Sequence, residues 1–378
     1  MDRKKIVILI NSLESGGAER VVINLLNDFV NRYDCYLILI HQNIFYTLDS
    51  RVKILNLNEQ KNLSGIKKFL RLPILAYKLS KLIKEYKFDQ VISFLSRSNY
   101  INILSNILIK HKTIINERAM PSLQYEYGIN GKINKILIKI LYPRASLCLS
   151  NSYGNMMDLK NNFNVVKIEY IHNLFNIETI EKLSKKDIEF QKKRFTFVTV
   201  GRLDSGKNHK LLIEAVKDFN ADLWIIGDGE LKEGLQKYIN ELNLNDKVYL
   251  LGKKENPFSF LSKADCFVFS SNYEGFPNVL VEALACGLPI ISTDCQSGPR
   301  EILAPTSNIS FQLNDKIEFA EYGVLTPIKN VEKLKEAMNL MINDENLRKN
   351  YQDKAKQRAN DFKIEKIIKQ YERILCAE

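Results

Sequence analysis

Several features that mark whole classes of proteins are scarce or missing in this sequence. No stretch approaches 18 uninterrupted apolar residues, and the apolar run near the start, Ile6–Ile10, is too short for a secretory signal. The six cysteines form no C-x-x-C pair and the four histidines are scattered, which disfavours a disulfide scaffold and a metal cluster. Only 16 glycines and 9 prolines occur in 378 residues, which disfavours a disordered chain. The sequence therefore predicts a cytoplasmic globular protein with reduced thiols and two domains.

The common nucleotide-binding motifs are missing as well. Neither G-x-G-x-x-G nor G-x-x-x-x-G-K-[ST] occurs, so a dinucleotide dehydrogenase and a P-loop nucleotidase lose support. No D-x-D triplet occurs either, so a metal-bridged diphosphate is not indicated and we expect no metal and no cofactor. No recognised nucleic-acid fold signature is found, so nucleic acid is not an expected partner.

Positive charge is concentrated in the first part of the chain. Residues 1–170 hold 25 Lys and Arg against 13 Asp and Glu, whereas residues 171–378 hold 30 against 31. Residues 65–87 and 132–144 place lysines beside apolar faces at helical spacing. Such helices can lie on an anionic membrane surface, but the same pattern is typical of a core-facing helix with a solvated basic face. The asymmetry favours the membrane surface, so we expect peripheral association with the inner face of the plasma membrane.

Short apolar runs alternate with helical patterns along most of the chain, which predicts parallel sheets with helical crossovers. The expected strands are 6–10, 36–40, 52–55, 91–94, 113–115, 147–149, 195–200, 222–226, 248–251, 266–269 and 289–292. A charged linker is expected around 171–193, and residues 330–376 look wholly helical. The predicted fold class is therefore α/β, with two Rossmann-like doubly wound domains, 1–170 and 171–378, facing a cleft.

Ligands of such sheets bind beyond the carboxyl ends of the strands. GRLDSGKN (201–208) lies between a strand and a helix, and its Arg202 and Lys207 can place two cations beside a diphosphate. The alternative is a surface turn with solvated charges. The context favours the functional interpretation.

The segment 274–282, EGFPNVLVE, places Glu274 in a loop and Glu282 about one turn into the next helix. Both carboxylates can accept hydrogen bonds from sugar hydroxyls, and the backbone N–H groups of the helix start can bind phosphate. The residues of that helix start are Asn278, Val279 and Leu280. The alternative is a carboxylate that only stabilises the helix dipole.

Three further loops carry candidate residues. Gly16 and Gly17 follow the first strand and allow close approach of a ligand to the backbone. Gly229 lies in GDGE (227–230), which either contacts a ligand or simply ends a strand. The segment 116–118, Asn-Glu-Arg, is the best place in the first domain for polar groups that reach the cleft, with a charged loop as the alternative, and Arg118 is its candidate catalytic residue.

Four segments resemble, in the same order along nearly the whole chain, the retaining glycosyltransferases of family four, which have the GT-B fold. They are GGAER (16–20), GRLDSGKN (201–208), GDGEL (227–231) and EGFPNVLVEALACGLPII (274–291). Within this family the sequence is most similar to bacterial N-acetylgalactosamine transferases that extend lipid-linked oligosaccharides. That similarity includes KFLRLPILAYK (68–78), IINER (114–118) and LYPRASLCLSNSYGN (141–155).

The resemblance implies a role for each matching residue. Arg202 and Lys207 match the diphosphate-binding pair, and Glu274 matches the acid that contacts the donor sugar. Glu282 matches the acid that holds the ribose hydroxyls. The glycine loop facing the donor phosphates is matched by Gly16 and Gly17. Many members have His where Arg118 stands.

The resemblance also implies an activity. A hexose or N-acetylhexosamine, best matched by N-acetylgalactosamine, would pass with anomeric retention from a UDP-sugar to a polyprenyl-diphosphate-linked glycan, in bacterial surface polysaccharide or glycoprotein glycan assembly. The first domain would bind the acceptor and face the membrane, and the second would bind the nucleotide sugar. The last helix, about 355–375, would pack back on the first domain. The alternatives are an isomerase similar to UDP-N-acetylglucosamine 2-epimerase and a non-catalytic UDP-sugar-binding subunit.

Overall fold

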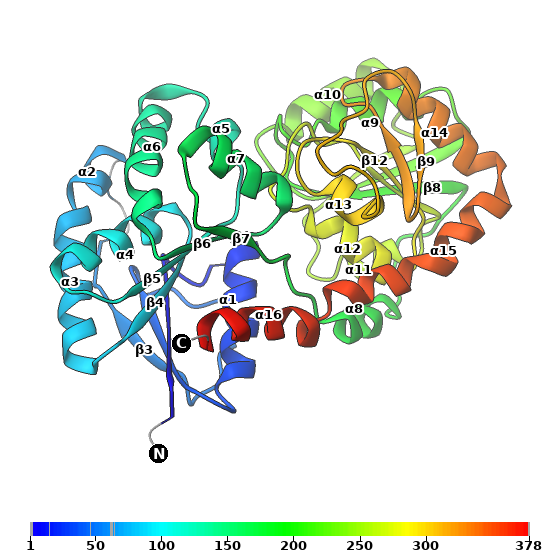
Figure 1. Cartoon of the computed structure of the whole chain (residues 1–378). Helices are drawn as coiled ribbons and strands as arrows, with labels where there is room; N and C mark the ends of the chain where they lie inside the picture. Colours follow the sequence, from blue (N-terminus) through cyan, green and yellow to red (C-terminus); the bar gives the residue numbers. More distant parts are fainter. Residues whose placement is uncertain (1–2, 15, 46, 61–62, 64, 377–378) are drawn as a thin grey trace. The chain divides into compact units, whose positions relative to one another are not determined.

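The computed structural model describes residues 3–14, 16–45, 47–60, 63 and 65–376 (Figure 1). The chain forms two compact units. Unit 1 comprises Met1–Leu174 and Ile367–Glu378, and unit 2 comprises Phe175–Lys366. The last residues of the chain therefore belong to the unit that the first residues form.

Unit 1 contains a seven-stranded parallel sheet with the order β3-β2-β1-β4-β5-β6-β7. The strands are β1 (Lys5–Ile10), β2 (Asp34–Leu39), β3 (Lys53–Asn56), β4 (Gln90–Phe94), β5 (Lys112–Glu117), β6 (Leu147–Ser150) and β7 (Ile168–Tyr170). Successive residues of β1 from Ile6 to Ile10 are all buried. Because successive side chains point to opposite faces of a sheet, both faces of the central strand are covered.

The helices of unit 1 connect these strands. They are α1 (Gly17–Phe29), α2 (Gly65–Leu70), α3 (Leu72–Tyr86), α4 (Ser96–Leu108), α5 (Pro121–Gln124), α6 (Gly128–Leu141), the 3₁₀ turn η1 (Tyr142–Arg144), α7 (Tyr153–Phe163) and most of α16 (Ile364–Cys376). Local sequence fixes several ends. The hydroxyl of Ser152 accepts a hydrogen bond from the backbone N–H of Asn155 at the start of α7. Lys87, with φ of 51°, ends α3 in the left-handed conformation.

Unit 2 contains a second seven-stranded sheet with the order β10-β9-β8-β11-β12-β14-β13, in which only β13 is antiparallel to its neighbour. The strands are β8 (Phe195–Val200), β9 (Ala221–Ile226), β10 (Val248–Gly252), β11 (Cys266–Phe269), β12 (Ile290–Thr293), β13 (Glu318–Ala320) and β14 (Gly323–Thr326). Val198 and Phe267 pack into one core, whereas Phe197 and Val268 pack into another. Helices thus cover both faces of the sheet.

The helices of unit 2 correct one expectation and bear out another. They are α8 (Ile177–Ser184), α9 (His209–Val216), α10 (Lys232–Glu241), α11 (Phe258–Leu261), α12 (Asn278–Ala285), α13 (Pro299–Leu303), α14 (Val331–Asn343), α15 (Glu345–Ala359) and the 3₁₀ turn η2 (Asn360–Phe362), followed by the start of α16. The expected linker 171–193 contains α8, which buries Ile177 and Ile180. Residues 330–376 are helical almost throughout, as expected, and they form α14, α15, η2 and α16, with Asp344 capping α15.

The predicted fold class is confirmed: each unit is an α/β Rossmann-like domain built on a mainly parallel sheet. All six cysteines are free. Burial raises the pKa of the Cys35 and Cys286 thiols to about 12. Among the described residues, no helix is long and apolar enough to cross a membrane.

Candidate active site

The parallel strands of unit 2 place the three candidate loops, 201–208, 227–230 and 274–282, at one edge of its sheet. The chain runs outward from β8 through β9 to β10 and then returns to β11 on the other side of β8. The loops after β8 and β11 therefore leave neighbouring strands at the point where the strand order reverses. That point is where doubly wound sheets bind ligands.

Lys207 and Glu274 meet at this switch point. The Lys207 ammonium forms an ion pair with the Glu274 carboxylate and lies 5.8 Å from the centroid of the Phe269 ring. The backbone of Lys207 is held as well, because its N–H donates to Asp204 Oδ1 at 3.1 Å and its carbonyl accepts from Ser270 Oγ at 2.8 Å. The structure thus fixes a cation between two loops, beside a carboxylate whose side chain is 11% exposed.

Arg202 takes a different position from the one expected of a paired cation. Its side chain is 77% exposed, and its Nε lies 2.8 Å from Asp204 Oδ2. Asp204 therefore contacts both the guanidinium of Arg202 and the backbone N–H of Lys207. Sequence reasoning did not single out Asp204, although it lies between the two cations in the motif.

Glycines let the loops after β8 and β9 pack backbone against backbone. A Cβ at Gly227 would lie 1.9 Å from Gly201 O, and one at Gly229 would lie 2.5 Å from Leu203 O. The N–H of Leu203 donates to Asp228 O, and the N–H of Leu231 donates to Leu203 O, both at 3.0 Å. Gly229 thus has a clear structural role, since any side chain there would push the two loops apart.

The first turn of α12 carries the residues expected at its N-terminus. Asn278, Val279 and Leu280 form this turn, and the preceding Pro277 provides no side-chain cap. Glu282 lies in the next turn and is buried. The backbone of the loop after β11 is held by Ser297, whose hydroxyl donates to Gly275 O at 2.6 Å.

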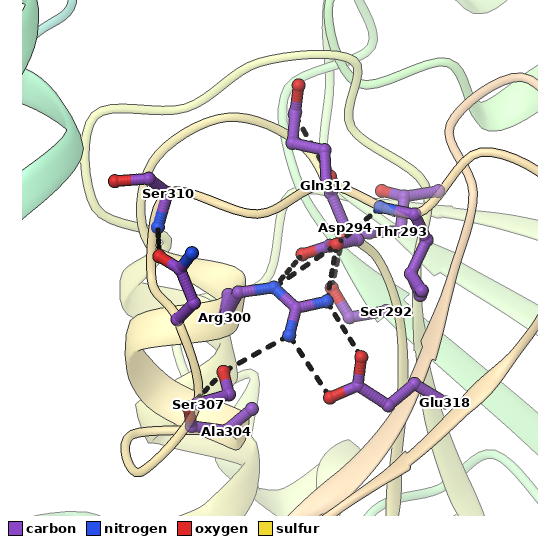
Figure 2. Close-up of polar contacts among 11 residues, drawn as sticks. Ser292, Thr293, Asp294, Arg300, Ala304, Ser307, Ser310, Gln312 and Glu318 are labelled. Atoms are coloured by element: carbon purple, nitrogen blue, oxygen red, sulfur yellow. Dashed lines mark hydrogen bonds and ion pairs between the residues drawn. The ribbon is translucent and has the colours of Figure 1, made fainter.

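A buried ion cluster that the sequence did not reveal follows β12 (Figure 2). The Arg300 guanidinium donates to Asp294 Oδ2 at 2.7 Å and to Glu318 Oε2 at 2.9 Å. Asp294 also accepts the backbone N–H of Leu313 at 2.9 Å. Arg300 and Asp294 have side chains that are 4% and 1% exposed. The cluster therefore fixes the long loop between α13 and β13 at the same edge of the sheet.

His209, the first residue of α9, is a further buried group near this edge. Burial lowers its pKa to about 4, and the positive charge of Lys207 acts in the same direction. Its Nδ1 has no hydrogen-bond partner among the described residues. The imidazole is therefore neutral at physiological pH.

In unit 1, Glu117 ends β5 as a buried acid. Its carboxylate accepts from Tyr142 Oη at 2.5 Å, from Ser96 Oγ at 3.1 Å and from the backbone N–H of Arg118 at 3.0 Å. Burial raises the pKa of Glu117, and these hydrogen bonds oppose the shift. Glu117 thus positions the chain at this strand end.

Arg118 follows directly and is half-buried. Its guanidinium donates to Asn116 Oδ1 and Tyr371 Oη, each at 3.3 Å, and to Asn173 Oδ1. All three acceptors are neutral, and no carboxylate of the described residues lies within ion-pair distance of it. The positive charge of Arg118 is therefore not neutralised by a direct partner.

The glycine loop of unit 1 leads into α1. Gly16 is the N-cap of α1 and Gly17 is its first residue. Glu19, in the first turn, has its pKa raised mainly by burial, while the charge of Arg118 acts to lower it. The start of α1 and Arg118 therefore act on each other electrostatically at one end of unit 1. Among the residues that the structure describes, no group of three or more His, Cys, Asp or Glu is placed to hold a metal ion.

Comparison with known proteins decides the family. Residues 181–358 match the family described as glycosyl transferases group 1. Over 373 residues the chain is 39% identical to a transferase of Campylobacter jejuni, covering 97% of this chain and 98% of the relative. The chain belongs to the glycosyl transferases group 1. The predicted family is therefore confirmed, and the protein is a glycosyltransferase.

The names of similar proteins describe their own activities. The 39% identical relative is named N-acetylgalactosamine-N,N'-diacetylbacillosaminyl-diphospho-undecaprenol 4-alpha-N-acetylgalactosaminyltransferase. A second Campylobacter jejuni enzyme, an alpha-1,4-N-acetyl-D-galactosaminyltransferase acting on an undecaprenol-linked glycan, is 29% identical and covers 98% of both chains. The Anabaena protein HepE, solved with UDP and glucose, has a TM-score of 0.76 at 19% identity and covers 99% of both chains. That likeness shows a shared GT-B fold.

The predicted site residues of this glycosyltransferase fall into two groups. Unit 2 brings together the loops of Arg202, Lys207, Gly229 and Glu274 and the start of α12. Gly16, Gly17 and Arg118 belong to unit 1. Sequence reasoning missed Tyr371, Asn173 and the Arg300 cluster. Asp294 carried a usable signal, since it directly follows an apolar strand at the carboxyl edge, whereas Tyr371 carried none.

Proposed function

We propose that this glycosyltransferase transfers N-acetylgalactosamine from UDP-N-acetylgalactosamine to a hydroxyl of an undecaprenyl-diphosphate-linked glycan, with retention of the anomeric configuration. The observation that carries the proposal is the Lys207–Glu274 ion pair at the switch point of the unit 2 sheet. A cation fixed at this point suits a diphosphate leaving group.

Contacts in unit 2 support a nucleotide-sugar donor. Lys207 and the exposed Arg202 supply positive charge, and α12 begins at the same edge without a side-chain cap. A helix N-terminus attracts phosphate through the positive end of the helix dipole. Glu274 and Glu282 are placed in the loop and in the following helix, where carboxylates can accept hydrogen bonds from hydroxyl groups. The UDP bound by the Anabaena protein supports the same class of donor.

The acceptor is proposed from the two Campylobacter jejuni relatives, whose names specify undecaprenol-linked glycans and N-acetylgalactosamine. Arg118 is the candidate for contact with an anionic or polar substrate group in unit 1. Its three acceptors are neutral, so its charge is available to a ligand.

The chemical step exchanges one bond at the anomeric carbon. The bond from C1 of the sugar to the β-phosphate oxygen breaks, and a bond from C1 to the acceptor oxygen forms on the same face. The acceptor proton passes to the departing phosphate oxygen, which gives UDP and the extended glycan. Lys207 and Arg202 would stabilise the charge that develops on the diphosphate. We propose that no metal is required, so EDTA would leave the rate unchanged.

A surface of unit 1 supports association with an anionic membrane. Leu70 of α2 and Ile129 of α6 are 72% and 75% exposed. The two helices are neighbours, since a Cβ at Gly65 would lie 2.8 Å from Asn130 Nδ2 (Figure 1). Exposed apolar groups beside lysines suit a bilayer surface with negative headgroups. The lysines of α6 are Lys132, Lys135 and Lys139.

The deciding experiment measures transfer by the Lys207→Ala variant. Purified enzyme would receive UDP-N-acetylgalactosamine and the undecaprenyl-diphosphate glycan named for the 39% identical relative, with UDP release and product mass as readouts. We expect kcat to fall by about 10²–10³-fold, as when a charge-stabilising donor is removed. The matched control is Lys263→Ala, which loses an exposed ion pair with Asp187. Near wild-type turnover of Lys207→Ala would remove the assignment.

The membrane proposal has its own test. Vesicles with and without phosphatidylglycerol would be sedimented with the wild type and with a variant in which the three lysines of α6 are replaced by Glu. We expect binding to the anionic vesicles only and its loss in the variant, because the opposite charge repels the headgroups. Equal binding of both proteins would contradict the proposal.

A further inference from the structure

Three segments far apart in the sequence hold the guanidinium of Arg118. Asn116 lies in β5, directly before Glu117, which ends that strand. Tyr371 comes from α16, 253 residues later, and Asn173 comes from the segment that precedes Phe175. Tyr371 Oη also accepts a hydrogen bond from Asn116 Nδ2 at 3.0 Å. The hydroxyl of Tyr371 therefore fixes both the strand end and Arg118.

Two of these segments are the connections between the units. The chain leaves unit 1 after Leu174 and returns to it at Ile367. Within unit 2 the two connections are bonded to each other, since Phe175 N–H donates to Phe362 O at 2.9 Å and Ile364 N–H donates to Phe175 O at 3.1 Å. Within unit 1 the same two connections meet at the Arg118 side chain.

We propose that Tyr371 and Asn173 are positioning residues for sugar transfer. They hold the Arg118 guanidinium at the carboxyl edge of the unit 1 sheet, so that the two connections between the units set the geometry of a substrate-binding cation. The inference rests on the proposed function, in which Arg118 contacts substrate. Neutral acceptors suit this task, because they orient the guanidinium without cancelling its charge.

The hydroxyl of Tyr371 is not needed to attach α16 to unit 1. Glu372 accepts from Tyr33 Oη at 2.6 Å and from Arg32 Nε at 3.1 Å, and the carbonyl of Leu375 accepts from Gln90 Nε2 at 2.7 Å. The ring of Tyr371 is fully buried. Tyr371→Phe keeps that ring and these attachments and removes only the oxygen that contacts Arg118 and Asn116.

The test compares Tyr371→Phe with Tyr33→Phe. Both variants lose one hydroxyl that bonds α16 to unit 1, but only Tyr371 contacts Arg118. We expect kcat/KM for transfer to fall by about 10-fold or more in Tyr371→Phe, because small misplacements of a reacting group are costly. Tyr33→Phe should keep kcat/KM within about 2-fold of the wild-type value. Its Tm should change by about as much as that of Tyr371→Phe. Asn173→Leu should resemble Tyr371→Phe.

A double-mutant cycle separates positioning from general damage. In an Arg118→Met background, we expect the added Tyr371→Phe substitution to lower kcat/KM by less than about 2-fold relative to Arg118→Met alone. An undiminished effect in that background would overturn the inference, as would equal losses in Tyr371→Phe and Tyr33→Phe.

Crystal structures keep this test separate from that of the proposed function. If the wild type transfers nothing from any UDP-sugar, the proposed function fails, but the position of Arg118 can still be compared between wild type and Tyr371→Phe. A guanidinium that is displaced from Asn116 and Asn173 in the variant would support the positioning role. An unmoved guanidinium would overturn it.

Discussion

The two sheets share the order of their first five strands but hold their candidate site cations in different ways. In unit 2, Lys207 pairs with Glu274 and Arg300 pairs with Asp294 and Glu318. In unit 1, Arg118 is held by amide and hydroxyl oxygens. One strand order therefore supports two ways of holding a cation, by direct ion pairs in unit 2 and by neutral hydrogen-bond acceptors in unit 1.

The largest expected effect follows from removing the central cation of the Arg300 cluster. Arg300→Met would leave the buried carboxylate of Asp294 without its partner, so we expect unfolding free energy to fall by about 3–5 kcal/mol in urea denaturation. Arg118→Met leaves only neutral acceptors and should cost about 1–3 kcal/mol. Equal losses of unfolding free energy in the two variants would show that pairing with carboxylates and holding by neutral acceptors do not differ in their effect on stability.

The next largest effect is expected from a substitution that gives Lys207 a neutral partner, as Arg118 has in unit 1. Glu274→Gln replaces the carboxylate next to Lys207 by a neutral amide, so the ammonium is held less firmly at the edge. We expect kcat to fall by about 10²-fold, measured as UDP release at saturating donor. Asp187→Asn, which alters an exposed ion pair with Lys263, should keep full activity. Full activity of Glu274→Gln would mean that the charge pairing is dispensable.

A pair of glycines tests the close packing of the unit 2 loops. Gly229→Ala places a Cβ 2.5 Å from Leu203 O, so we expect a loss of about 2 kcal/mol in unfolding free energy. Gly234→Ala, in α10, meets nothing within 4 Å and should stabilise the protein by about 0.5–1 kcal/mol. Unfolding in urea distinguishes the two signs, and a neutral Gly229→Ala would show that the loops can separate.

The smallest effect is a dependence on pH, with opposite signs in the two units. The pKa of His209 is about 4 in the folded protein and 6.5 in the unfolded chain. Its contribution to the unfolding free energy is therefore fully present above pH 6.5 and is lost as the pH falls toward 4. From pH 7 to 5 we expect the wild type to lose about 1–2 kcal/mol more than His209→Asn.

The raised pKa of Glu117 acts in the other direction. Its contribution is fully present below the unfolded pKa of 4.5 and is lost as pH rises through the folded pKa. Relative to Glu117→Gln, the wild type should therefore lose stability as pH rises above 4.5. Urea denaturation at several pH values would measure both differences. If unfolding free energy varied with pH equally in a variant and in the wild type, the pKa shift assigned to the replaced residue would be refuted.

The sequence predicts the central strands well because they are buried on both faces and read as continuous apolar runs, as in Phe195–Val200. β7, β13 and β14 were not predicted. β7 and β13 have three residues each and are partly exposed, whereas β14 is a buried strand of only four residues. The meeting of Lys207 and Glu274, 67 residues apart, follows from the rule that parallel strands end at one edge.

No such rule connects α16 to Arg118, because helical periodicity does not say which sheet a helix covers. The charges around Arg300 resemble solvated ones in sequence, and only packing reveals their burial.

The bonded connection at Phe175, Phe362 and Ile364 has a practical consequence. Unit 2 is a single uninterrupted stretch of chain whose two ends are neighbours, as in a cassette inserted at one point of a host. Exchanging residues 175–366 for the matching stretch of a relative would require only two adjacent splice junctions. If unit 2 binds the donor and unit 1 the acceptor, as the proposed function requires, such chimaeras would change the donor sugar while the host retains its own acceptor.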